Sequence, residues 1–77
     1  MNRLAEIETF IAVVNAGSQL AAAQRMNIAV SAINRRIHDL EARLGVELTY
    51  RTQQGTTLTH YGQTYYDRCI RVVADLN

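Results

Sequence analysis

Residues 30–45 read VSAINRRIHDLEARLG and carry the clearest periodicity in the chain. Apolar side chains recur in this stretch every three or four residues: Val30, Ile33, Ile37, Leu40 and Leu44. At about 100° per residue these positions share one face of an α-helix. The opposite face collects polar and small side chains: Ser31, Asn34, Arg35, His38 and Ala42. The stretch therefore predicts an amphipathic helix from Val30 to Leu44, and the glycine that follows is expected to end it.

Two shorter helices are expected before this one. The first follows Asn2, a good N-cap, and runs to about Asn15. Its apolar side chains form a stripe at helical spacing: Leu4, Ile7, Phe10, Ile11 and Val14. The second, from about Gln19 to Met26, is rich in alanine, so another helix can approach it closely. A short helix, a tight turn and a longer helix with a polar face together predict a helix-turn-helix.

After residue 45 the sequence changes from helical to strand-favouring. Residues 46–58 are rich in Thr, Tyr and Leu, and Gln53-Gln54-Gly55 supplies a turn, so we expect a small β-hairpin. Thr59 is expected to cap a fourth helix that reaches about Leu76. The predicted fold is mainly α, a winged helix-turn-helix with a three-helix core, a small hairpin wing and a C-terminal helix.

Composition indicates one small globular domain and excludes several classes of protein. The 77 residues are 48% hydrophobic and 19% charged, with no secretory signal pattern. No apolar run reaches the roughly 18 residues of a membrane span, so we expect a cytoplasmic protein without a membrane partner. Cys69 is the only cysteine, which excludes an internal disulfide. His38, His60 and the acids form no catalytic or metal-binding pattern, so we expect no enzyme, metal or cofactor.

The charges are distributed unevenly along the chain. All eight basic side chains are Arg, yet the net charge is only +1. No acid lies between Glu8 and Asp39, and none lies between Glu47 and Asp67. Two acid-free windows in so small a protein indicate surfaces kept free of negative charge, as a phosphate backbone requires. Chance spacing of seven acids is the alternative interpretation.

The polar face of residues 30–44 carries side chains suited to reading duplex DNA. Arg35 can pair in bidentate fashion with guanine, and Asn34 with adenine. Ser31 lies in the first turn, where its hydroxyl and nearby N–H groups can meet a phosphate. His38 lies one turn further along, and Arg51 in the hairpin can contact the DNA backbone or minor groove. An ordinary solvated helix surface is the alternative for this face.

The predicted fourth helix carries an apolar seam with spacings of four and three. Its members are Gly62, Tyr66, Cys69, Val73 and Leu76. Such a seam suits packing against another helix, including one from a second subunit. We expect a homodimer on a dyad-related DNA site, with dimer contacts from Tyr66, Cys69, Val73 and Leu76. For Cys69 itself, a core position is favoured over a role as nucleophile.

The sequence resembles the N-terminal domain of LysR-type transcriptional regulators along essentially its whole length. The matching residues include Val13-Val14-Asn15-Ala16-Gly17-Ser18, Ala22-Ala23, Arg35, Leu40-Glu41, Leu44-Gly45-Val46, Arg51 and Leu58-Thr59. The resemblance implies a winged helix-turn-helix domain at residues 1–58 and a linker and dimerisation helix at residues 59–77. We expect the effector-binding domain of that family to be absent from this chain, so a small-molecule effector would act only through that domain.

Several residues depart from the family's usual pattern. Ala29-Val30 replaces a Ser cap and a Gln base contact, and Asn34 replaces a Ser. Gln19-Leu20 replaces an aromatic followed by Ser or Thr, so both motif helices lack the usual cap unless Ser18 or Ser31 serves, at about 1 kcal/mol each. We assign DNA contacts to eight residues: Val30, Ser31, Asn34, Arg35, His38, Arg51, Gln53 and Gln54. DNA binding is expected to persist with an altered sequence preference.

A winged helix kept for dimerisation or protein interaction, with weak or no DNA binding, is the main alternative. The apolar seam and Tyr61, Tyr65 and Tyr66 suit that role. Gln54 stands where a wing arginine is common in the family, and this loss of charge points the same way. Steep salt dependence of binding to duplex DNA would separate the two interpretations.

Overall fold

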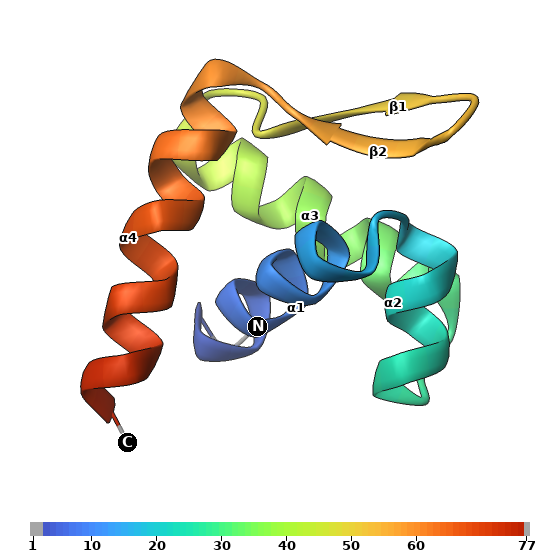
Figure 1. Cartoon of the computed structure of the whole chain (residues 1–77), viewed down its shortest axis with the longest axis horizontal. Helices are drawn as coiled ribbons and strands as arrows, with labels where there is room; N and C mark the ends of the chain where they lie inside the picture. The colour runs from blue at the N-terminus through green and yellow to red at the C-terminus, as the bar shows by residue number, and fades with distance from the viewer. Residues whose placement is uncertain (1–2, 77) are drawn as a thin grey trace.

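The computed structural model describes residues 3–76 of the chain. Its elements are, in chain order, α1 (Arg3–Ala16), α2 (Gln19–Met26), α3 (Val30–Leu44), β1 (Thr49–Thr52), β2 (Gly55–Leu58) and α4 (His60–Leu76). Figure 1 shows the hairpin lying over the three N-terminal helices, and α4 running from the hairpin base along the side of the molecule away from α2. The predicted winged helix-turn-helix fold is confirmed. The cap expected at Asn2 lies outside the described residues.

The two helices of the helix-turn-helix begin differently. The hydroxyl of Ser18 accepts a hydrogen bond from the Ala21 amide at 3.1 Å, so Ser18 caps α2 and supplies the cap that its family-pattern residues lack. Ala29 precedes α3 and makes no side-chain bond. Both helices end on a left-handed residue, Asn27 (φ 58°) and Gly45 (φ 75°) respectively. The first turn of α3 therefore has no side-chain partner for its backbone N–H groups.

The core lies between α1, α2 and α3 and extends to the wing base and α4. Its buried apolar side chains are Phe10, Val13, Ala22, Ala23, Ile33, Ile37, Leu40, Leu48 and Cys69. The three central residues of the predicted α3 core face are buried as expected. The two ends of that face differ from the prediction, since Val30 is 45% exposed and Leu44 38% exposed. The position of Val30 leaves it open to solvent beside the polar face.

The buried face of α1 also differs from the predicted apolar stripe. Leu4 is 40% exposed, whereas Glu6 and Thr9 are buried. Polar partners on α3 explain the difference, because Glu6 forms an ion pair with Arg43 and the Thr9 hydroxyl accepts from Arg36 Nη1 at 3.1 Å. A hydrophobic periodicity alone does not register a buried polar position whose partner lies elsewhere in the chain.

The hairpin is antiparallel, and its register sets a short turn. Thr52 faces Gly55, which leaves Gln53-Gln54 as the turn residues. The Thr56 amide donates to the Gly17 carbonyl oxygen at 2.8 Å, which ties the wing to the turn between α1 and α2. A Cβ at Gly55 would lie 2.2 Å from that oxygen, so glycine is required for this approach.

The start of α4 is locked to the base of the wing. The Thr59 hydroxyl accepts from the Gly62 amide at 3.0 Å, which confirms Thr59 as the cap, and donates to the Glu47 carbonyl at 2.6 Å. The Thr59 amide donates to the Leu48 carbonyl at 3.0 Å. A Cβ at Gly62 would lie 1.9 Å from that same carbonyl oxygen. The chain therefore enters α4 in one fixed direction.

Candidate nucleic-acid interface

The outward face of α3 carries every predicted contact residue of that helix. Ser31, Asn34, Arg35 and His38 are exposed, and Val30 lies beside them at the uncapped N-terminus. Free backbone N–H groups and the positive end of the helix dipole favour an anion at such a terminus. This face therefore offers amide, hydroxyl, imidazole and guanidinium groups along about two turns of helix.

The wing places a cation and two amides beside this face. Arg51 on β1 and the turn residues Gln53 and Gln54 are all exposed. The turn is stabilised internally, since the Thr52 hydroxyl donates to the Gly55 carbonyl and accepts from the Gln54 amide, each at 3.2 Å. The two glutamine side chains project from a fixed hairpin end, as a wing that contacts a DNA backbone would need.

A single buried amide joins the wing to α3. Gln19, the first residue of α2, is only 9% exposed. Its Oε1 accepts from Arg51 Nη2 at 2.8 Å and from Asn34 Nδ2 at 3.4 Å. In the sequence Gln19 stands out only as a departure from a family pattern, and these contacts are not predicted from it. No local signal predicts them, because the partners lie 15 and 32 residues away.

A carboxylate fixes the base of the wing. Glu41 on α3 accepts from the Leu48 amide at 2.7 Å and from the Thr49 amide at 3.1 Å through the same oxygen. Bonds from neutral donors to a carboxylate are stronger than those between neutral groups. Glu41 therefore fixes the start of β1 relative to α3, and so fixes the position of the wing beside that helix.

Two carboxylates of the helical core are engaged inside the molecule. Glu6 pairs with Arg43, and Glu41 is bonded to the wing amides. Within residues 3–76 the ion pair that forms is Arg43–Glu6, so neither Arg35 nor Arg51 is paired with a carboxylate of that part of the chain. The face formed by α3 and the wing thus carries two arginines, while the acids of α3 are Asp39 and Glu41.

The predicted dimer seam of α4 is divided between the core and the surface. Cys69 is buried in the domain core, and burial raises the pKa of its thiol. The hydroxyl of Tyr66 donates to Asn15 Oδ1 at 2.6 Å, and its ring lies 6.4 Å from that of Phe10. Of the other two residues, Val73 is half-buried and Leu76 is exposed. Tyr66 and Cys69 therefore make contacts within their own domain, and the assignment of the four residues to a dimer interface stays a prediction.

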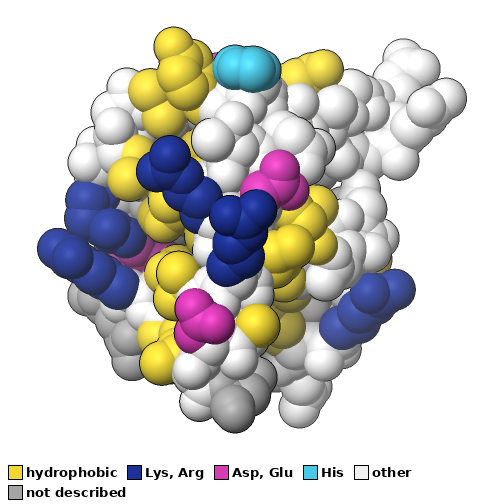
Figure 2. All heavy atoms as spheres, turned by 60° about the vertical axis from the view of Figure 1, so that its left-hand side comes forward, with side chains coloured by type: hydrophobic (Ala, Val, Ile, Leu, Met, Phe, Trp, Pro, Cys, Tyr) yellow, Lys and Arg dark blue, Asp and Glu magenta, His cyan; other side chains and the backbone are white. Residues whose placement is uncertain are grey.

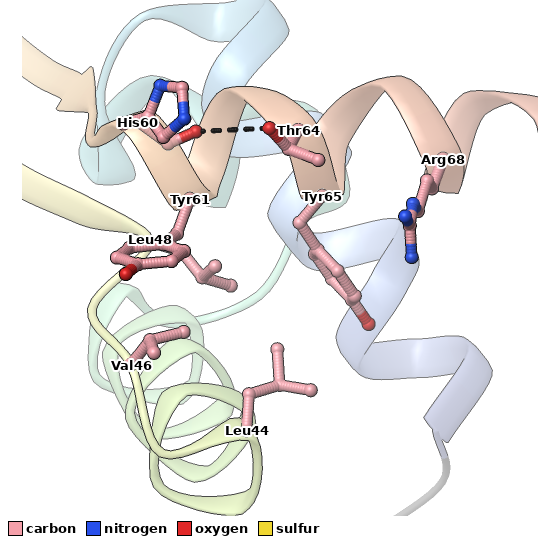
Figure 3. A pocket seen from close by; sticks show the side chains of 8 residues that line it. All are labelled: Leu44, Val46, Leu48, His60, Tyr61, Thr64, Tyr65 and Arg68. Carbon is pink, nitrogen blue, oxygen red and sulfur yellow. Dashed lines mark hydrogen bonds between the residues drawn. The ribbon is translucent and has the colours of Figure 1, made fainter.

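A second apolar stripe of α4 faces outward. Tyr61, Val72 and Leu76 are exposed and, with half-buried Tyr65, recur at intervals of four and seven residues. Figure 2 shows this side of the molecule, where hydrophobic side chains lie among arginines and acids. Tyr61 and Tyr65 also line an open hollow of about 400 Å³ between α4 and the end of α3 (Figure 3). Tyr61 and Tyr65 therefore belong both to the stripe and to the hollow.

No three His, Cys, Asp or Glu side chains within residues 3–76 gather closely enough to hold a metal ion. None of the helices in that range is long and apolar enough to cross a membrane.

Comparison with known proteins gives close relatives among bacterial regulators. The chain is 41% identical over 69 residues to an HTH-type transcriptional repressor of Pseudomonas aeruginosa, which covers 90% of this chain and 22% of the repressor. It is 37% identical over 71 residues to the regulator CrgA of Neisseria meningitidis, covering 92% of this chain and 24% of CrgA. The chain thus spans less than a quarter of the length of these curated relatives.

Solved structures with the same fold include complexes with DNA. The DNA-binding domain of CbnR in complex with DNA superimposes with a TM-score of 0.90 at 34% identity, covering 95% of this chain and 84% of that one. The BenM domain bound to benA site 1 DNA gives 0.92 at 29% identity, covering 97% and 87%. Residues 4–63 match the family described as bacterial regulatory helix-turn-helix protein, lysR family. With both sequence and fold in agreement, this chain belongs to the lysR family and is a DNA-binding domain of that family.

Proposed function

We propose that this domain binds a specific double-stranded DNA site with α3 in the major groove and the wing on the adjacent backbone. The observation that carries the proposal is the exposed α3 face beside Arg51, where neither Arg35 nor Arg51 is paired with a carboxylate of the described residues. A major groove about 12 Å wide admits one helix, and side chains near its N-terminus reach the base edges.

Each outward residue then has a role set by its chemistry. Arg35 pairs with guanine and Asn34 with adenine, while Val30 packs on a thymine methyl group. Ser31 binds a phosphate at the uncapped helix terminus. The remaining contacts come from His38 to base or phosphate, and from the wing residues Arg51, Gln53 and Gln54 to the backbone or minor groove.

We further propose that the domain acts as a homodimer through α4 on a dyad-related site. Because Tyr66 and Cys69 pack internally, the contacts are placed on the outward stripe of Tyr61, Tyr65, Val72 and Leu76, with Val73 at its edge. Val72→Asp is expected to shift the domain to monomer in sedimentation experiments, whereas Ala74→Asp, on the opposite side of α4, should not. Equal effects of both substitutions would contradict this interface.

The biological role follows from DNA binding. Relatives of this chain are named transcriptional repressors, activators and regulators, so we propose non-catalytic transcriptional regulation. Bacterial chromosomal DNA lies in the cytoplasm, and we place the protein there. A small-molecule effector would act through a domain outside this chain.

Selection of bound sites from a random duplex pool tests the DNA-binding proposal. We expect enrichment of paired, dyad-related half-sites, and a steep decrease in affinity as salt rises, of about 0.9 in log–log slope for each phosphate contact. Arg35→Ala should weaken the selected site more than random duplex. An unenriched pool with salt-independent binding would instead favour a dimerisation or protein-interaction module, which the outward apolar stripe and hollow of α4 would suit.

A further inference from the structure

The junction of α2, α3 and the wing is organised around one uncharged acceptor. Gln19 Oε1 receives hydrogen bonds from Asn34 and Arg51 at once, and its own side chain is almost fully buried. Hollows of about 330 Å³ and 230 Å³ open on either side of this junction, and both are lined by Gln19 and Arg51. The residue thus stands between two open grooves next to the exposed contact groups.

The contact of 3.4 Å from Asn34 Nδ2 to Gln19 favours one orientation of the Asn34 amide. Nδ2 carries two hydrogens, and one of them is directed at Gln19. The second hydrogen and Oδ1 remain for a ligand. Adenine offers N7 as an acceptor and its N6 amino group as a donor in the major groove, which matches this pair of groups. Guanine offers two acceptors there, N7 and O6, so it would face Oδ1 with a second acceptor.

The bond from Arg51 restrains a long side chain without removing its charge. A carboxylate at residue 19 would neutralise the guanidinium, whereas the amide oxygen only orients it. The guanidinium has five N–H donors, and those not bonded to Gln19 remain for phosphate. Restraining the side chain before binding lowers the entropy lost when DNA is bound.

We infer that Gln19 is a positioning residue for base recognition: it orients the Asn34 amide toward adenine and holds Arg51 in register with it. The inference rests on the proposed placement of α3 in the major groove. Gln19 itself lies behind the contact groups and acts through them.

Gln19→Met tests this inference, because methionine keeps the length and burial of the side chain but lacks the acceptor. Gln24→Met, at an exposed position of the same helix, is the matched control. Binding of each domain to the selected duplex, and to duplexes with single base changes, is measured by fluorescence anisotropy. The position read by Asn34 is identified as the one where Asn34→Ala abolishes base preference.

At that position we expect the wild-type domain to prefer adenine over guanine by on the order of 10-fold. Gln19→Met should bring the ratio of the affinities for adenine and guanine at that position close to one. In the Asn34→Ala background, Gln19→Met should not change this ratio further. Gln24→Met should leave it unchanged. In the DNA-free domain, Gln19→Met should change the nuclear magnetic resonance chemical shifts of the Asn34 side-chain amide, whereas Gln24→Met should not.

Two results overturn the inference while leaving DNA binding in place. In one, the wild-type domain selects a site but Gln19→Met retains its adenine preference. In the other, the Asn34 amide signals are the same with and without Gln19. If the wild-type domain selects no site, both the proposed function and the inference are wrong, and the random-pool experiment detects that case separately.

Discussion

Glu41 should be the residue on which wing placement most depends. Its carboxylate accepts both the Leu48 and the Thr49 amides, and the Thr49 hydroxyl lies 3.5 Å from the same oxygen. Glu41→Ala removes the acceptor from all three donors. The Leu48 residue is only 1% exposed, so water has little access to replace the lost bond there.

The size of the effect follows from these two amides. A buried N–H left without an acceptor costs about 1–3 kcal/mol, and a bond to a charged acceptor contributes about 1.5–3 kcal/mol. Thr49 is half-buried, so water recovers part of its loss. We therefore expect Glu41→Ala to lower the free energy of unfolding by roughly 2–4 kcal/mol. Glu41→Gln keeps one acceptor oxygen and should cost about 1 kcal/mol.

Urea unfolding followed by circular dichroism measures these changes. The matched control is Glu47→Ala, an exposed acid in the same connection whose loss should change stability by about 0.5 kcal/mol or less. Where the Glu41 variants remain folded, DNA affinity and its salt dependence should both decrease, because the wing is no longer fixed to α3. A stability loss for Glu41→Ala as small as that of the control would refute the proposed role of this carboxylate.

Three further predictions concern the base contact, the helix cap and the pH dependence. Arg35→Ala should weaken the selected site on the order of 10-fold by anisotropy, with a smaller loss on random duplex; equal losses would remove Arg35 from base reading. Ala29→Ser should raise the free energy of unfolding by about 1 kcal/mol in thermal melts, because the backbone there is already extended (φ −68°, ψ 145°) and lacks a side-chain cap. Burial raises the pKa of the Cys69 thiol above 9.0 and that of the Tyr65 hydroxyl above 10.0, so the folded state retains these protons longer than the unfolded chain. Stability should therefore be full below pH 9 and fall as the pH rises beyond it, and Cys69→Ala should reduce that slope in urea titrations.

Local features of the sequence were sufficient to predict the elements of the fold. The apolar periodicity of α3, its closing glycine and the Thr59–Gly62 cap each depend on residues no more than four positions apart. Such features depend on backbone geometry that a short stretch determines. The sequence does not predict which polar side chains pack inside the domain when their partner lies in another element. Glu6 with Arg43 and Tyr66 with Asn15 are examples.

In the candidate site, too, some features can be predicted from neighbouring residues and others depend on residues distant in sequence. Residues on the outer face of α3 follow from its periodicity, and all of them are exposed as expected. The contacts of Gln19 and Glu41 instead depend on how the wing returns across α2 and α3, which periodicity does not contain. For α4, the sequence contains two apolar stripes, and no local feature tells which of them packs on α1 and which faces outward.

These distant contacts bear on how the domain can change its DNA preference while keeping its fold. The uncapped start of α3 and the apolar Val30 leave the first turn with few hydrogen-bonding side chains for bases. Asn34, one turn later, is linked through Gln19 to Arg51, so a base contact and a wing contact share one support. A substitution at residue 19 would then alter both contacts without touching DNA or the apolar core. Sequence preference in this domain is therefore expected to vary with the junction of α2, α3 and the wing as well as with the exposed face of α3.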